Sequence, residues 1–263
     1  MKLKINSLPE LENLLKGVIR FVSGCRIVAT PTHTKIFVGN KEQTIRVFLE
    51  TNSLVLEPAN EEETECQINI KELGKLITAF NMLKDCGVST DNGPIYLERK
   101  HKNYGEYLSY SGKAKFDLKL DKPDATEEFI TPALKETTVI NDVFSWSMDQ
   151  NKIDMLTKYS KFNNNVIVNV YFHLSDGLLY ADIDNKKMSM ISSASLPISN
   201  EFEGELTETV CADLEAIRLW SMICSTNIHA AFTDKNCFRI RAMTGTADGI
   251  KTKMTMINSR LKS

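Results

Sequence analysis

The side chains that usually carry catalysis are few in this sequence and lie outside any known catalytic spacing. No phosphate-binding glycine loop, dinucleotide fingerprint, zinc-protease motif or paired-cysteine motif is present. Asp182 and Asp184 have a spacing that a metal ion could use, but they lead into Asn185 and fit a hairpin turn better. We therefore expect a protein that is not an enzyme, with no catalytic residues, no metal site and no cofactor. Four histidines occur singly: His33, His101, His173 and His229.

Charge and cysteine content are those of an ordinary globular protein. The net charge of −2 gives the chain no overall basic character. The sequence shows neither a secretory leader nor an apolar run of roughly 20 residues, so we expect an intracellular protein without a membrane partner. Six cysteines are scattered through apolar patterns, as expected of buried reduced thiols: Cys25, Cys66, Cys86, Cys211, Cys224 and Cys237.

Basic side chains on four predicted helices offer a different chemistry, the binding of phosphate groups. These helices carry nine basic residues against six acids, an excess of +3, whereas the whole chain has a net charge of −2. Such segregation suits a surface that contacts nucleic-acid phosphates without reading bases. The alternative is that the lysines only solvate amphipathic helices. The basic residues are Lys16, Arg20, Lys71, Lys75, Lys84, Lys152, Lys158, Lys161 and Arg218, and the acids are Glu10, Glu12, Glu72, Asp154, Asp213 and Glu215.

The first of these helices is predicted over residues 8–22. Apolar residues recur at helical spacing along one side of it. Glu12, Lys16 and Arg20 follow one another at i, i+4 steps on the opposite side, where we expect them to face solvent.

A strand that runs directly into an amphipathic helix occurs twice. The first copy is Glu65–Leu83 and the second is Leu206–Ile223. A further helix is predicted over Asn151–Phe162. A unit that recurs once in a chain of this length indicates an internal duplication.

Each half of the chain therefore reads as strand, helix, three strands, strand, helix, three strands. We predict an α+β fold with two tandem duplicated domains of antiparallel sheet, each with two helices on one face. The predicted boundaries are 1–120 for the first domain, 121–138 for a linker rich in acids and prolines, and 139–263 for the second domain.

This order and spacing resemble the DNA sliding clamps of the two-domain kind, a family that includes proliferating cell nuclear antigen and the clamps of T-even-like phages. The likeness covers nearly the whole chain. It is carried by MKLKI at residues 1–5 with the helix after it, by Glu65–Leu83, by the linker and by the tail from Leu206 to Ile257.

The resemblance implies a homotrimeric ring whose helices line a hole around double-stranded DNA, held without sequence specificity. The ring would tether the replicative DNA polymerase and would be placed on DNA by a clamp loader, without chemistry of its own. It would act where DNA is replicated, in the bacterial cytoplasm if a phage encodes it, and the many asparagines, lysines and isoleucines fit such an origin.

The resemblance also places a groove for partner peptides and the edges that close the ring. Strand edges around Glu106–Phe116 and Lys187–Ser192 would pair between copies. The groove residues, by position, are Val38, Phe129, Ile130, Thr255 and Met256.

Two other functions stay open from the sequence. One is a monomeric processivity subunit that grips DNA with a basic face instead of a closed ring. The other is a structural or adaptor protein of a virus, built from a duplicated β-rich domain without a role on DNA. The modest basic excess of the helices argues against an open grip, because such a grip needs more phosphate contacts.

Overall fold

The computed structural model describes residues 1–19, 24–39, 45–60, 62–70, 72–99, 106–111, 115–121, 141–162, 169–184, 194–213, 228–245, 249 and 251–259. Contacts divide the chain into two compact units, one of Met1–Thr137 with Gly245–Met254 and one of Thr138–Thr244 with Thr255–Ser263. The second domain was predicted over 139–263, whereas Gly245–Met254 group with the first unit. Of the predicted linker, 121–138, only Asp121 lies among the described residues.

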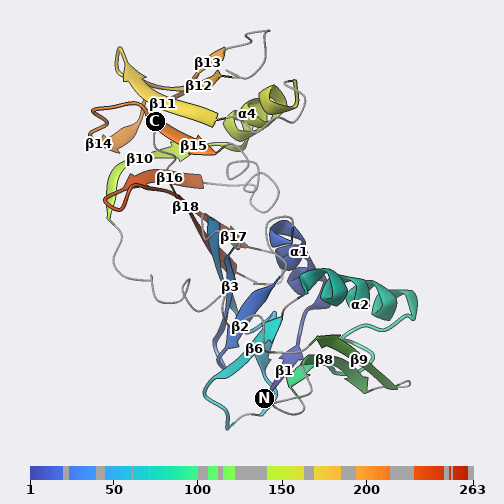
Figure 1. Ribbon diagram of the computed structural model, residues 1–263. Coiled ribbons are helices and arrows are strands. Elements are labelled where there is room, and N and C mark those ends of the chain that lie inside the picture. Colours follow the sequence, from blue (N-terminus) through green and yellow to red (C-terminus); the bar gives the residue numbers. More distant parts are fainter. Residues whose placement is uncertain are drawn as a thin grey trace. The chain divides into compact units, whose positions relative to one another are not determined.

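The first unit consists of two antiparallel sheets with α1 and α2 side by side (Figure 1). One sheet has the order β5-β1-β7-β8-β9, and the other begins β6-β2-β3-β4 and continues to the start of β18. The elements are β1 (Lys2–Ile5), α1 (Leu8–Val18), β2 (Cys25–Ala29), β3 (His33–Gly39), β4 (Ile45–Asn52), β5 (Leu56–Pro58), β6 (Cys66–Ile70), α2 (Leu73–Asp85), β7 (Ile95–Arg99), β8 (Glu106–Ser111) and β9 (Lys115–Asp121).

The second unit repeats this arrangement with strands β14-β10-β16-β17 in one sheet and β13-β12-β11-β15 in the other. The predicted helix after β15 falls at 214–223, outside the described residues. The elements are β10 (Asp142–Met148), α4 (Gln150–Phe162), β11 (Asn169–Ser175), β12 (Leu178–Asp184), β13 (Ala194–Ser199), β14 (Phe202–Gly204), β15 (Val210–Asp213), β16 (Ile228–Thr233), β17 (Cys237–Gly245) and β18 (Lys251–Ser259).

The strand pairings themselves are duplicated. β1 pairs with β5 and β7, and its counterpart β10 pairs with β14 and β16. Likewise β2 pairs with β3 and β6, and β11 pairs with β12 and β15. Every one of these pairings is antiparallel, so the predicted α+β fold of duplicated antiparallel domains is confirmed.

Residue spacing explains why α1 and α2 form where they do. In α1 the residues Leu8, Leu11 and Leu15 are buried on one side, and Pro9 occupies the first turn, where its missing N–H costs nothing. In α2 the buried side contains Leu76 and Phe80, both fully inaccessible to solvent. Burying each such side chain contributes about 1.5–3 kcal/mol, which fixes both helices against the rest of the unit.

The residues of strand β18 are divided between the two units. Its residues up to Met254 group with the first unit, where it follows β4 in the sheet order. The Thr252 hydroxyl lies 3.2 Å from that of Thr51, and the Asn52 amide donates to the carbonyl of Gly249 at 2.8 Å. These bonds secure the outer side of β4.

The sheet edge predicted for the first domain differs from the one in the structure. β8 lies between β7 and β9, so the edge is β9 and not the Glu106–Phe116 segment, because that segment is divided between the two strands of a hairpin. Lys187–Ser192 lies outside the described residues, and among the described strands β13 and β15 are the edges of the sheet β13-β12-β11-β15. None of the helices in the described ranges is long and apolar enough to cross a membrane.

Candidate nucleic-acid interface

The helix pair α1–α2 is held together by a carboxylate beneath two lysines. Glu12 of α1 is only 2% exposed. Its Oε1 lies 2.7 Å from Nζ of Lys16, one turn further along α1, and its Oε2 accepts a hydrogen bond from Nζ of Lys84 at the end of α2. The two lysine side chains remain 53% and 41% exposed. The prediction that Glu12 faces solvent is therefore wrong, because α2 packs across that side of α1.

The pKa of Glu12 reflects both its burial and its partners. Burial by itself raises the pKa of this carboxyl, because a charged group loses hydration. The hydrogen bonds and charges of Lys16 and Lys84 outweigh burial, and the net effect lowers the pKa below its ordinary value of 4.5. Glu12 is therefore ionised at neutral pH.

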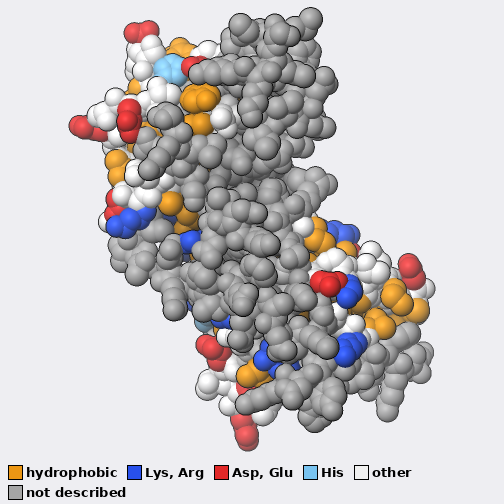
Figure 2. All heavy atoms as spheres, viewed as in Figure 1, with side chains coloured by type: hydrophobic (Ala, Val, Ile, Leu, Met, Phe, Trp, Pro, Cys, Tyr) orange, Lys and Arg blue, Asp and Glu red, His pale blue; other side chains and the backbone are white. Residues whose placement is uncertain are grey.

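The remaining predicted lysine of α2 is also paired. Nζ of Lys75 lies 2.9 Å from a carboxylate oxygen of Glu72, and both side chains are exposed. Asp85, which the sequence count omitted, is the last residue of α2 and is exposed, so it lowers the counted basic excess from three to two. Figure 2 shows the same interleaving, with acidic and basic side chains next to one another over α2.

Helix α4 presents its basic residues in a different way. Asp149 caps its N-terminus by accepting the backbone N–H of Lys152 at 2.8 Å. The side chain of Lys152 turns toward β13 and donates to the carbonyl of Pro197 at 3.0 Å. Lys158 is exposed and has no ion-pair partner within the described residues. Lys161 lies in the same helix, and its side chain is not among those that the structure describes.

The structure therefore supports an exposed position for Lys16, Lys75, Lys84 and Lys158 on three helices, with Lys152 half-buried at the start of α4. The other predicted DNA-facing residues lie outside the described residues: Arg20, Lys71 and Arg218.

The residues predicted for the peptide groove receive little structural support. Val38 is 1% exposed and lies within β3, opposite Val47 of β4, so it offers no surface to a partner. Thr255 is half-buried on β18. Met256 lies on the same strand, with its side chain outside the description, and Phe129 and Ile130 are not among the described residues.

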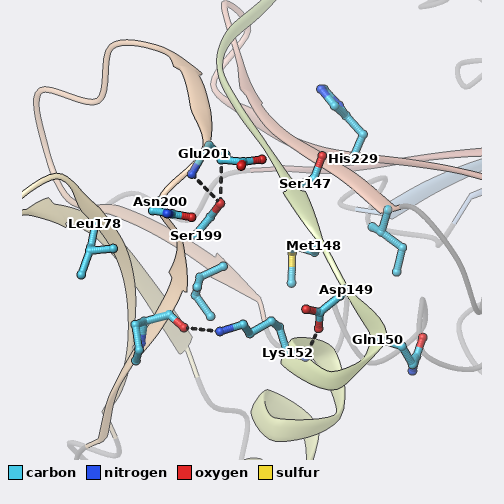
Figure 3. A pocket seen from close by; sticks show the side chains of 13 residues that line it. Ser147, Met148, Asp149, Gln150, Lys152, Leu178, Ser199, Asn200, Glu201 and His229 are labelled. Carbon is cyan, nitrogen blue, oxygen red and sulfur yellow. Dashed lines mark hydrogen bonds between the residues drawn. The ribbon is translucent and has the colours of Figure 1, made fainter.

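A hollow in the second unit was not anticipated from the sequence. It measures about 750 Å³ and is lined by residues from β10, α4, β12, the β13–β14 turn and β16 (Figure 3). Lys152 crosses it toward Pro197, and Ser199 accepts the backbone N–H of Glu201 at 3.1 Å. Because its lining comes from segments far apart in the chain, no local pattern could have revealed it.

No group of three or more histidine, cysteine or acidic side chains in the described ranges could hold a metal ion. Asp182 and Asp184 both lie in β12, which continues through them in register with β11, and Asn185 of the predicted turn lies outside the described residues. Asp182 instead lies 3.2 Å from Nδ1 of His173 on the neighbouring strand.

The comparisons with known proteins rest on structure. No protein-family model matches the chain, and no curated protein matches it in sequence. A. fulgidus PCNA, solved with the C-terminal region of FEN-1, superposes with a TM-score of 0.69 at 12% identity, over 100% of this chain and 99% of that one. The chain has the fold of a DNA sliding clamp.

Other clamps superpose over the same extent. Proliferating cellular nuclear antigen from Entamoeba histolytica gives a TM-score of 0.67 at 10% identity, over 99% of this chain and 98% of that one. The PCNA2–PCNA3 complex from Sulfolobus tokodaii gives 0.66 at 14% identity, over 99% of both chains. The clamp fold therefore includes the whole chain, and at these identities the likeness extends to the fold alone.

Proposed function

We propose that this chain is a DNA sliding clamp, a non-enzymatic ring that encircles duplex DNA and tethers the replicative polymerase. The observation that carries the proposal is the duplicated antiparallel topology, which superposes on clamps over the full length of the chain. The exposed lysines of α1, α2 and α4 support it, because phosphate contacts that carry no base readout suit a ring that moves along any sequence.

The strand edges support a ring of identical copies. In the first unit β4 has β18 as its outer neighbour, whereas its counterpart β13 lies at the edge of its sheet in the described structure. Strand β9, the counterpart of β18, is also an edge. Pairing β9 of one copy with β13 of the next would repeat the β4–β18 junction. Such head-to-tail contacts close into a ring, and with two units per copy we propose a homotrimer.

The ion pairs of the helices favour a closed ring over the open grip of a monomeric processivity subunit. An open grip depends on many uncompensated cations to stay on DNA. Here Lys16, Lys75 and Lys84 are all paired with carboxylates. A ring holds DNA by topology and tolerates weak contacts.

The remaining residues and partners belong to the same proposal. The proposed domains are 1–120 and 139–263, and 121–138 is the segment that connects them. The proposed ring acts inside the cell, where a clamp loader opens it on DNA. A. fulgidus PCNA binds the C-terminal region of FEN-1, which supports capture of partner peptides. The groove residues that stay in the proposal are Phe129, Ile130, Thr255 and Met256, without the buried Val38. The proposed channel residues are Lys16, Arg20, Lys71, Lys75, Lys84, Lys152, Lys158, Lys161 and Arg218.

The deciding experiment is the mass of the protein in solution, measured by light scattering at several concentrations and salt levels. We expect a species with three times the mass of the chain, and retention on closed circular DNA with loss after the circle is cut. A strict monomer that binds linear and circular DNA equally would replace the ring with an open processivity subunit.

A further inference from the structure

Every lysine within α1 and α2 is held by a carboxylate, and one of these carboxylates is buried. Glu72 and its partner Lys75 are both solvent-exposed, as is usual for a surface ion pair. Glu12 differs, because it is 2% exposed and its two oxygens form ion pairs with two lysines, Lys16 on the same helix and Lys84 on α2. Lys16 and Lys84 therefore present their charges to solvent over a common negative charge.

We propose that Glu12 is a positioning residue that limits the grip of the clamp on DNA. It holds Lys16 and Lys84 at fixed places on the helix face and cancels one of their two charges. This inference rests on the proposed function, because it concerns the strength with which the same helices contact phosphate.

The burial of Glu12 supports a role in charge over a role in packing. The positions around it on α1 are filled by Leu8, Leu11 and Leu15, and an apolar side chain at position 12 would extend that buried surface. Removing a carboxylate from water is costly, and buried ion pairs are often no more stabilising than apolar residues of similar volume. The carboxylate adds something that an apolar residue cannot, a negative charge beneath two lysines.

The consequence for DNA binding is a change in salt dependence. Each phosphate that a protein neutralises makes the slope of log K against log salt more negative by about 0.9. The cluster of Glu12, Lys16 and Lys84 carries a net charge of +1 and is expected to neutralise one phosphate. Between 50 and 200 mM salt, one further contact corresponds to about a 3- to 4-fold additional loss of affinity.

The test compares the full-length protein with three variants by titrating a fluorescently labelled linear duplex at 50–200 mM salt. Glu12→Gln raises the charge of the cluster to +2, and we expect tighter binding at low salt with about 3- to 4-fold greater loss of affinity across this range. Lys84→Gln lowers the charge to zero, and we expect the opposite change. The double variant Glu12→Gln/Lys84→Gln restores +1, and its slope should match that of the unaltered protein.

A merely structural role for Glu12 would not produce this pattern. An unchanged slope in Glu12→Gln, with the unaltered protein binding duplex normally, would overturn this inference and leave the proposed function standing. Absence of linear-duplex binding by the unaltered protein at every salt level would overturn this inference alone, because a ring held by topology need not bind linear DNA. Failure of the unaltered protein to be retained on closed circular DNA would overturn the proposed function as well. If Glu12→Gln does not fold, Glu12→Met makes the same change of charge with an apolar side chain of similar length. Failure of both variants to fold would assign Glu12 to folding and overturn the proposal.

Discussion

Trp146 of β10 lies against Phe172 of β11, with ring centroids 5.2 Å apart, although the two strands belong to different sheets of the second unit. Trp146 is 2% exposed and Phe172 is fully buried. Phe232 and Phe238 belong to the same cluster, with centroids 5.2 and 6.0 Å from that of Trp146. This aromatic group joins the sheet that contains β10 to the one that contains β11, and so sets the core of the unit.

Replacing Trp146 with alanine should lower the free energy of unfolding by about 3–5 kcal/mol, because it leaves a large cavity between the two sheets. Trp146→Phe should cost much less, since it keeps a ring in place and removes an indole N–H that has no partner among the described residues. Urea denaturation followed by circular dichroism measures both. The control is Met243→Ala, a site 64% exposed, where the change should stay within about 0.5 kcal/mol. Equal losses at positions 146 and 243 would contradict the role of the cluster.

The cysteines of the first unit should differ sharply in reactivity. Burial raises the pKa of the Cys25 thiol, and burial together with the charge of Glu63 raises the pKa of Cys66 to about 11. Since the thiolate is the reactive form, neither should react with iodoacetamide at pH 8 while the protein is folded. Exposed Cys86 should react within minutes. Mass mapping of the alkylated peptides checks this, with urea-unfolded protein as the control in which all three react. Early labelling of Cys25 would contradict the packing described for β2.

Glu12 should make the stability of the first unit sensitive to acid. Its pKa is lowered in the folded state, so the unfolded chain binds more protons in the acid range. The contribution of Glu12 is therefore complete above its ordinary pKa of 4.5 and is lost as the pH falls through the lower folded-state value. Thermal melts from pH 7 to pH 3 should show the difference between the unaltered protein and Glu12→Gln shrinking below pH 4.5. A difference that stays constant over this range would show that the carboxylate carries no pairing energy.

Residue periodicity predicted the helices and strands well because their buried side chains recur at regular spacing along each element. The helix predicted over 151–162 is found at Gln150–Phe162, since the buried Ile153 and Leu156 lie on one side of it. The strand-to-helix unit at Glu65–Leu83 is found as β6 followed by α2, with only two residues between them. In these elements each side chain's environment is decided by neighbours within a few residues.

The parts that escaped prediction depend on partners distant in sequence. Glu12 shares the i, i+4 spacing of a solvent-facing residue, and only the packing of α2 against α1 buries it beneath Lys84. Val38 was predicted to lie in a surface groove because of its position in the chain. In the structure Val38 pairs with a residue of β4 and is buried in the core. Asp184 was predicted to lie in a turn, but β12 continues through it and pairs it with Asn169 of β11. One-dimensional patterns carry no information about which element covers which.

Lysines on separate helices should contribute additively to DNA binding. Lys158 on α4 and Lys75 on α2 are exposed and lie in different units. Replacing Lys158 with alanine should make the slope of log K against log salt less negative by about 0.9. Lys75→Ala should change the slope less, because Glu72 already offsets the charge of Lys75, and the double variant should show the sum of the two changes. Neither change should alter the melting temperature much, because exposed ion pairs such as Lys75–Glu72 contribute little to stability.

The matched control is Lys253→Ala, which removes an exposed lysine from β18 and not from a helix. Its salt dependence should equal that of the unaltered protein, because the sheets are expected to face away from DNA. If Lys253→Ala weakens binding as much as Lys158→Ala does, the contacts with phosphate are not confined to the helices, and a general basic surface would replace the channel.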